Sequence, residues 1–144
     1  MSEVEHEKGK IYLGACPESF EFKQEVKAHL EGMGYLIVDL GGFAIDEPVT
    51  CSVIGREVAE KVIENTIFEH DSDSHGDRVY GLLFSPEGKD LEDSIQIIEQ
   101  AKAAVVEPQT DLAQLKVLGN HIFCFATNRL SIHNVKEALD VLLN

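Results

Sequence analysis

Basic residues are scarce in this chain, and long apolar runs are absent from it. Twelve lysines and arginines stand against 26 aspartates and glutamates, so the formal net charge is −14 at pH 7. Such an acidic surface repels phosphate backbones and anionic lipid, and we therefore expect no nucleic acid and no membrane as partners. No apolar run approaches the roughly 20 residues of a membrane span, and the start of the chain does not resemble a secretory signal peptide.

Cysteine is also rare, and its usage bears on the redox compartment. The three cysteines, Cys16, Cys51 and Cys124, are odd in number and widely spaced. A disulfide framework is therefore not expected, and a reducing cytoplasm fits this usage better. A chain of 144 residues is long enough to bury a core without disulfides or metals. We expect a frayed polar tail over residues 1–9 and a single domain over residues 10–144.

Short apolar runs alternate with amphipathic stretches along the whole domain. The strands are expected at about 10–15, 35–40, 79–84, 102–106 and 121–126, and the helices at about 18–32, 50–66, 90–100, 109–118 and 132–143. Continuous apolar runs are typical of strands in a sheet that is covered on both faces. The strict alternation predicts an α/β fold, a three-layer α/β/α sandwich around a five-stranded parallel, Rossmann-like sheet.

One polar segment, residues 65–77, interrupts this alternation and is expected to be an exposed loop. Asp71, Asp73 and Gly76 partly match a calcium-binding loop. The glutamate that closes such a loop would fall on Leu82, inside an expected strand. A solvated acidic loop is therefore the favoured interpretation, and we expect no metal site and no cofactor.

The start of the domain carries the most informative pattern. Lys10-Ile-Tyr-Leu-Gly14 predicts a buried strand, a helix carrying Phe20, Glu21 and Lys23 follows, and Gly34-Tyr-Leu-Ile-Val-Asp39 leads into a second strand. This pattern resembles the ribose-5-phosphate isomerase B / galactose-6-phosphate isomerase family, and the resemblance extends over residues 10–143. General physics favours the commoner strand order 2-1-3-4-5, whereas the resemblance implies 2-1-3-5-4, which we adopt.

The resemblance implies an isomerase that moves a proton between adjacent carbons of a sugar phosphate. Such a reaction needs a base, donors for the developing oxyanion and cations for the phosphate. An Asp-His pair of the family falls on Cys16 and Pro17 here. The family's cysteine base falls on Ser85, whose hydroxyl is a poor proton acceptor without a base beside it. Pro86 removes one N–H group from a loop whose N–H groups bind the anion in the family.

Further positions are partly kept and partly replaced. The glycine-rich loop of the family retains Gly88 but places the carboxylate of Glu87 where a threonine stands, and Glu92 lies one position away from an alternative glutamate base. The ring-opening histidine of the family falls on Leu118. Four matched positions are the candidates for substrate binding, namely Asp46, Gly88, Asn120 and Arg129, and the catalytic candidates are Cys16, Ser85 and Glu87.

The preferred interpretation is a catalytically degenerate relative of these isomerases that acts as a binding or assembly subunit. The alternative is an active aldose–ketose isomerase that uses Cys16, Ser85, Glu87 or Glu92 in new roles. A third hypothesis is a redox- or ligand-responsive module centred on Cys16, because a thiolate near the start of a helix is stabilised by the helix dipole.

The resemblance also implies the partners. It implies a sugar or sugar-phosphate ligand and a homodimer or higher oligomer in which each subunit lends the segment at Leu118-Gly119-Asn120 to its neighbour. An intact paralogue is a second candidate partner. Leu115 and Leu118 have a competing interpretation, in which they cover the sheet of their own subunit.

Overall fold

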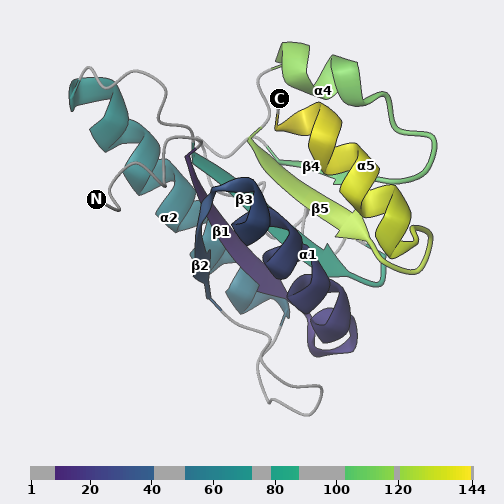
Figure 1. The fold of residues 1–144 in the computed structure, drawn as a ribbon. Helices are drawn as coiled ribbons and strands as arrows, with labels where there is room; N and C mark the ends of the chain where they lie inside the picture. Colours follow the sequence, from purple (N-terminus) through teal and green to yellow (C-terminus); the bar gives the residue numbers. More distant parts are fainter. Residues whose placement is uncertain (1–8, 41–50, 73–78, 88–102, 119–120, 144) are drawn as a thin grey trace.

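A computed structural model describes residues 9–40, 51–72, 79–87, 103–118 and 121–143 and shows a parallel sheet between two layers of helices (Figure 1). The strands are β1 (Lys10–Ala15), β2 (Leu36–Asp39), β3 (Val79–Ser85), β4 (Ala103–Val106) and β5 (Ile122–Ala126). The strand order is β2-β1-β3-β5-β4, and all four pairings are parallel. The fold class and the strand order implied by the resemblance are both confirmed.

The helices lie on both faces of this sheet. They are the 3-10 turn η2 (Pro17–Ser19), α1 (Phe20–Met33), α2 (Cys51–Ser72), α4 (Leu112–Leu118) and α5 (Ile132–Leu142). In Figure 1, α1 and α5 cover one face of the sheet and α2 covers the other. The helix expected at 90–100 lies outside the described residues. No helix in the described part of the chain is long and apolar enough to cross a membrane.

Helix α2 is longer than the sequence analysis predicts. The exposed loop was expected to begin near residue 65, but the helix continues to Ser72. Residues 65–72 contain neither proline nor glycine. An established helix gains one hydrogen bond for each residue added and needs no new nucleus, so polar residues without a breaker extend it. The polarity of this segment was therefore misread as a loop signal.

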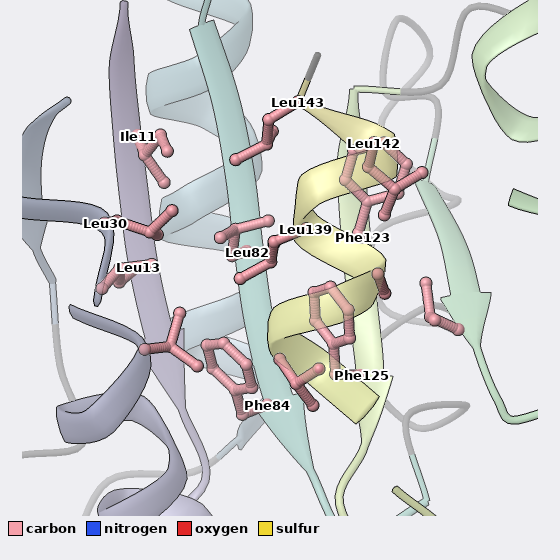
Figure 2. Packing of buried hydrophobic residues seen from close by; sticks show 14 of the residues in the cluster. Ile11, Leu13, Leu30, Leu82, Phe84, Phe123, Phe125, Leu139, Leu142 and Leu143 are labelled. Atoms are coloured by element: carbon pink, nitrogen blue, oxygen red, sulfur yellow. The ribbon is translucent and has the colours of Figure 1, made fainter. Parts of the chain in front are cut away.

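The larger core layer lies between the sheet and helices α1 and α5. Figure 2 shows side chains of alternate strand residues meeting side chains of both helices. The contributing strand residues point to the same face because side chains alternate along a strand. The layer includes Ile11, Leu13, Leu30, Leu82, Phe84, Phe123, Phe125, Leu139, Leu142 and Leu143, and all of them are nearly or fully buried.

The second core layer lies between the sheet and α2, and it depends on two glycines in the strands. Ile54, Val58 and Val62 of α2 pack against the sheet here. A Cβ atom added at Gly14 of β1 would overlap Ile54 and lie 3.1 Å from Val58. One added at Gly81 of β3 would lie 2.8 Å from Val58. The absence of side chains at both positions is what lets the aliphatic residues of α2 reach the sheet.

The ends of two helices follow local sequence signals. Gly34 ends α1 in the left-handed region at φ 100°, where a residue with a Cβ atom is strained. Ser131 caps the start of α5. Its hydroxyl accepts a hydrogen bond from the backbone N–H of Asn134, and the Asn134 side chain accepts one from the backbone N–H of Ser131. These caps fix where α1 leaves the sheet and where α5 returns to it.

Candidate functional site

The loops that follow β1, β3 and β5 meet at the carboxyl edge of the sheet, where open parallel sheets bind their ligands. The backbone N–H of Cys16 donates to the carbonyl of Phe84 at 2.9 Å. The N–H of Thr127 donates to the carbonyl of Ser85 at 2.8 Å, and that of Asn128 to the carbonyl of Pro86 at 2.9 Å. These bonds hold the three loops in a fixed mutual position.

Cys16 lies at this edge, as expected from its place after the first strand. It is buried, with 2% of its surface exposed, and it is disulfide-bonded. The second sulfur lies outside the described side chains. A disulfide sulfur carries no thiolate, so Cys16 is not a nucleophile in this structure. The sequence analysis expected no disulfide framework and did not foresee this bond, while Cys124 is a buried thiol in β5.

Ser85 ends β3 beside Cys16 and is equally buried, with 3% of its surface exposed. It pairs with Ala126 of β5 in the parallel register, and its carbonyl holds the N–H of Thr127. Burial at a strand end gives this serine a structural position between two strands. A base that acts on a substrate must come within hydrogen-bond reach of it, and 3% exposure leaves Ser85 little access to one.

A pair of hydroxyl groups connects the same loops and was not foreseen from the sequence. The Oγ of Ser19 lies 2.8 Å from the Oγ1 of Thr127, and Ser19 is 1% exposed. Serine before a helix usually indicates an N-cap, and Ser19 precedes α1, but its side chain makes no capping bond there. Its hydroxyl is used to tie the first loop to the fifth-strand loop.

Three charged side chains follow β3, β4 and β5 in the described part of this edge, namely Glu87, Glu107 and Arg129. Glu87 is exposed after β3. The Nη1 of Arg129 donates to the Oε2 of Glu107 at 3.0 Å, and the other oxygen of that carboxylate accepts from Gln109 at 3.1 Å. Arg129, the candidate phosphate ligand, is therefore engaged by a carboxylate of its own subunit. A bound phosphate would have to compete with Glu107 for the guanidinium.

The remaining candidates, Asp46, Gly88 and Asn120, lie outside the described residues, as does Glu92. Leu118 is the last residue of α4, and its side chain is also outside the described set. Leu115 is half-buried and packs against the core of its own subunit. The structure thus brings Cys16 and Ser85 together and places Arg129 against Glu107. In the described part of the chain, no three His, Cys, Asp or Glu side chains form a group that could hold a metal ion.

Comparison with known structures finds the same fold in a group of isomerases. The ribose-5-phosphate isomerase B of Mycoplasma genitalium, solved with bound ribulose-5-phosphate, matches with a TM-score of 0.80 and 18% identity, over 94% of this chain and 83% of that one. The isomerases B of Clostridium thermocellum and Thermotoga maritima match with TM-scores of 0.79 and 18% identity, over 94% of this chain and 84% and 86% of theirs. No family model and no curated protein matches the sequence. The chain has the ribose-5-phosphate isomerase B fold at low identity.

Proposed function

We propose that the protein is a catalytically degenerate relative of ribose-5-phosphate isomerase B and acts as a binding or assembly subunit. The observation that supports it best is the ion pair between Arg129 and Glu107. It places an anionic group of the protein 3.0 Å from the guanidinium of Arg129, the one cation among the described candidates for substrate binding. The fold is kept while a group needed for a phosphorylated substrate is already neutralised.

Two further features of the carboxyl edge support the same proposal. Cys16 stands where the related isomerases carry the first residue of an Asp-His pair, and its sulfur is held in a disulfide. Ser85 stands in place of the base cysteine and is almost fully buried. Proton transfer needs a group with a suitable pKa within reach of the substrate. Neither a disulfide sulfur nor a buried serine hydroxyl supplies one.

Turnover of ribose 5-phosphate tests the proposal directly. The purified protein is mixed with ribose 5-phosphate, and ketose formation is followed with the Thermotoga maritima enzyme as positive control. We expect no ketose above the uncatalysed rate. Turnover on the order of 10 per second, ordinary for metabolic enzymes, would refute the proposal. In that event the alternative of a rearranged active isomerase gains support if Glu87→Gln abolishes the activity while Glu57→Gln, on the outer side of α2, leaves it unchanged.

The proposal includes a homodimer or higher oligomer with a sugar or sugar-phosphate ligand. The Mycoplasma structure of the same fold holds ribulose-5-phosphate, which supports a ligand of this class. A two-fold interface is self-complementary and persists when the chemistry of a site is lost. Sedimentation at micromolar concentration should show a dimer. Leu118→Asp should dissociate it while the monomer stays folded, because an unpaired carboxylate is costly to bury at a subunit contact. A wild-type monomer would contradict this part of the proposal.

A further inference from the structure

A pocket of about 290 Å³ lies beside the candidate site, between the end of β4 and one face of α5. One wall is formed by the end of β4 and the turn after it, and the other by a single face of α5. Leu112 of α4 and Leu130 also line the pocket. The lining residues are Val106, Glu107, Pro108, Thr110, Leu112, Leu130, Asn134, Glu137, Ala138 and Val141. Side chains three and four positions apart share one face of a helix, which is why the four α5 residues line one wall.

The apolar part of this pocket suits a small hydrocarbon body. Val106, Leu130 and Ala138 are buried at its base. Val141 stands at its mouth and is one of two large apolar side chains in the described residues that are exposed, with 42% of its surface accessible. Pockets of about 300 Å³ with mostly apolar walls are at the lower end of the range that binds small molecules. The volume therefore admits a single ring or a short alkyl chain.

The charged residues that line the pocket favour a ligand with a positive charge. Among the described residues, Glu107 and Glu137 are the charged ones that line the pocket, and none of the described lysines, arginines and histidines lines it. Glu107 already binds Arg129 at its edge. The side chain of Glu137 is 66% exposed, and its Oε2 lies 3.1 Å from the Nε2 of His133, which is charged only when protonated. Of the two carboxylates, Glu137 thus retains the more unneutralised charge.

Hydrogen bonds of the protein itself fix both walls of the pocket. The side-chain oxygen of Asn134 accepts the backbone N–H of Ser131 at 3.2 Å, at the start of α5. Thr110 accepts the N–H of Glu107 at 2.8 Å, which fixes the turn that forms the opposite wall. The walls are therefore held by the fold itself and do not depend on a ligand.

We propose that this pocket binds a primary ammonium group carried on a short apolar body. The hydrocarbon part lies against Leu112, Leu130 and Val141, and the ammonium lies at the carboxylate of Glu137. The site is separate from the proposed sugar-phosphate function, and its ligand has the opposite charge. The strongly acidic chain, at −14, attracts such a cation from a distance as well.

The test uses the full chain labelled with ¹⁵N and phenethylammonium as the probe. We expect saturable shifts of the amide signals of Val106, Leu112, Ala138 and Val141, with a dissociation constant of about 1–10 mM for a ligand of this size. 2-Phenylethanol, which has the same body without charge, should bind more weakly, and 3-phenylpropionate more weakly still. Salt should weaken binding of the ammonium but not of the alcohol.

Two matched pairs of variants locate the site. Val141→Lys places a cation at the exposed valine of α5 that lines the pocket, and it should remove binding. Val53→Lys is the control, because Val53 lies on α2 and is similarly exposed, at 43%, and it should leave binding unchanged. Glu137→Gln should weaken binding about two- to fivefold, the usual effect of one exposed charge pair. Glu64→Gln, which removes an equally exposed carboxylate, 65% exposed, from α2, should not.

Specific outcomes would overturn the proposal. It is wrong if no saturable shift occurs at the amides of these walls, or if 3-phenylpropionate binds as tightly as phenethylammonium. It is also wrong if Val141→Lys binds like the wild type, provided that its spectrum shows the native fold. Because none of these measurements uses a sugar phosphate, their result is independent of the outcome of the isomerase assay.

Discussion

Lys23 on α1 and Asp39 at the end of β2 form a buried ion pair, with the Nζ 2.7 Å from the Oδ1. The Lys23 side chain is fully buried and that of Asp39 is 7% exposed. Lys27 lies 3.5 Å from the other carboxylate oxygen, and the Lys23 ammonium lies 5.6 Å from the centre of the Phe20 ring. Lys23 and Asp39 both belong to the sequence pattern at the start of the domain, and their ion pair connects helix α1 to β2, the edge strand of the sheet.

Removing the cation from this pair should destabilise the protein strongly. Lys23→Met removes the nearer of two lysines from the buried Asp39 carboxylate, and breaking a buried pair typically costs about 3–5 kcal/mol. Lys61→Met is the control, because its pair with Glu64 is exposed and 3.9 Å long and such pairs contribute at most about 1 kcal/mol. Urea unfolding measures both losses. Equal losses would show that the buried pair has no special weight.

Two glycine substitutions should change stability in opposite directions. Gly14→Ala places a methyl group against Ile54 and Val58, and overpacking of this kind costs about 1–3 kcal/mol. Gly32→Ala lies in α1 with no atom within 4 Å of the new Cβ, so the gain in helix propensity should stabilise by up to about 1 kcal/mol. Thermal unfolding should show a lower melting temperature for Gly14→Ala and a higher one for Gly32→Ala than for the wild type. A neutral Gly14→Ala would mean that α2 is free to move away from the sheet.

Ser131→Ala should weaken α5 through its cap. The variant loses the bond to the N–H of Asn134 and the reciprocal geometry of the box, for an expected cost of about 1 kcal/mol. Ser131→Thr keeps the hydroxyl and should recover most of that stability. The midpoint of urea unfolding reports both changes. If the threonine variant is as unstable as the alanine variant, the loss does not come from the capping bond.

Glu107→Gln should make the carboxyl edge more receptive to phosphate. The substitution removes the anion that now occupies Arg129, and one exposed pair of this type corresponds to a change of about two- to fivefold in affinity. Titration of ribose 5-phosphate, followed by amide shifts of Thr127 and Arg129, measures the gain. Glu87→Gln removes an exposed carboxylate from the same edge but none from Arg129, so its gain should be smaller. Equal gains would indicate a general charge effect.

The strands were predictable because each is a continuous apolar run with a breaker or a polar residue at its end. The expected bounds of the first strand, 10–15, are those of β1, and Val79–Ser85 differs from expectation by one residue. The strand order did not follow from such patterns and came from the resemblance alone. The extension of α2 to Ser72 was not predicted. The polar composition of residues 65–72 indicated a loop, although these residues contain no proline or glycine that would end a helix.

The contacts of the candidate site were less accessible to sequence reasoning. The edge position of Cys16 and Ser85 follows from strand ends, which a sequence shows. The hydroxyl pair of Ser19 and Thr127 joins residues 108 positions apart, and no local pattern signals it. The disulfide at Cys16 was missed for the same reason, since pairing depends on proximity in the folded chain rather than on spacing. Side-chain partnerships between distant loops are what the sequence left open.

Gly14 and Gly81 lie on the neighbouring strands β1 and β3. Each leaves a gap in the surface of the sheet, a notch, into which side chains of α2 fit. Val58 packs close to both glycines, Ile54 packs against Gly14, and Val62 packs against Gly81. One notch would fix the position of the helix along its axis, but two on different strands also fix its rotation. These contacts oppose sliding and rolling of α2 over the sheet, so a displacement of β1 or β3 should carry α2 with it.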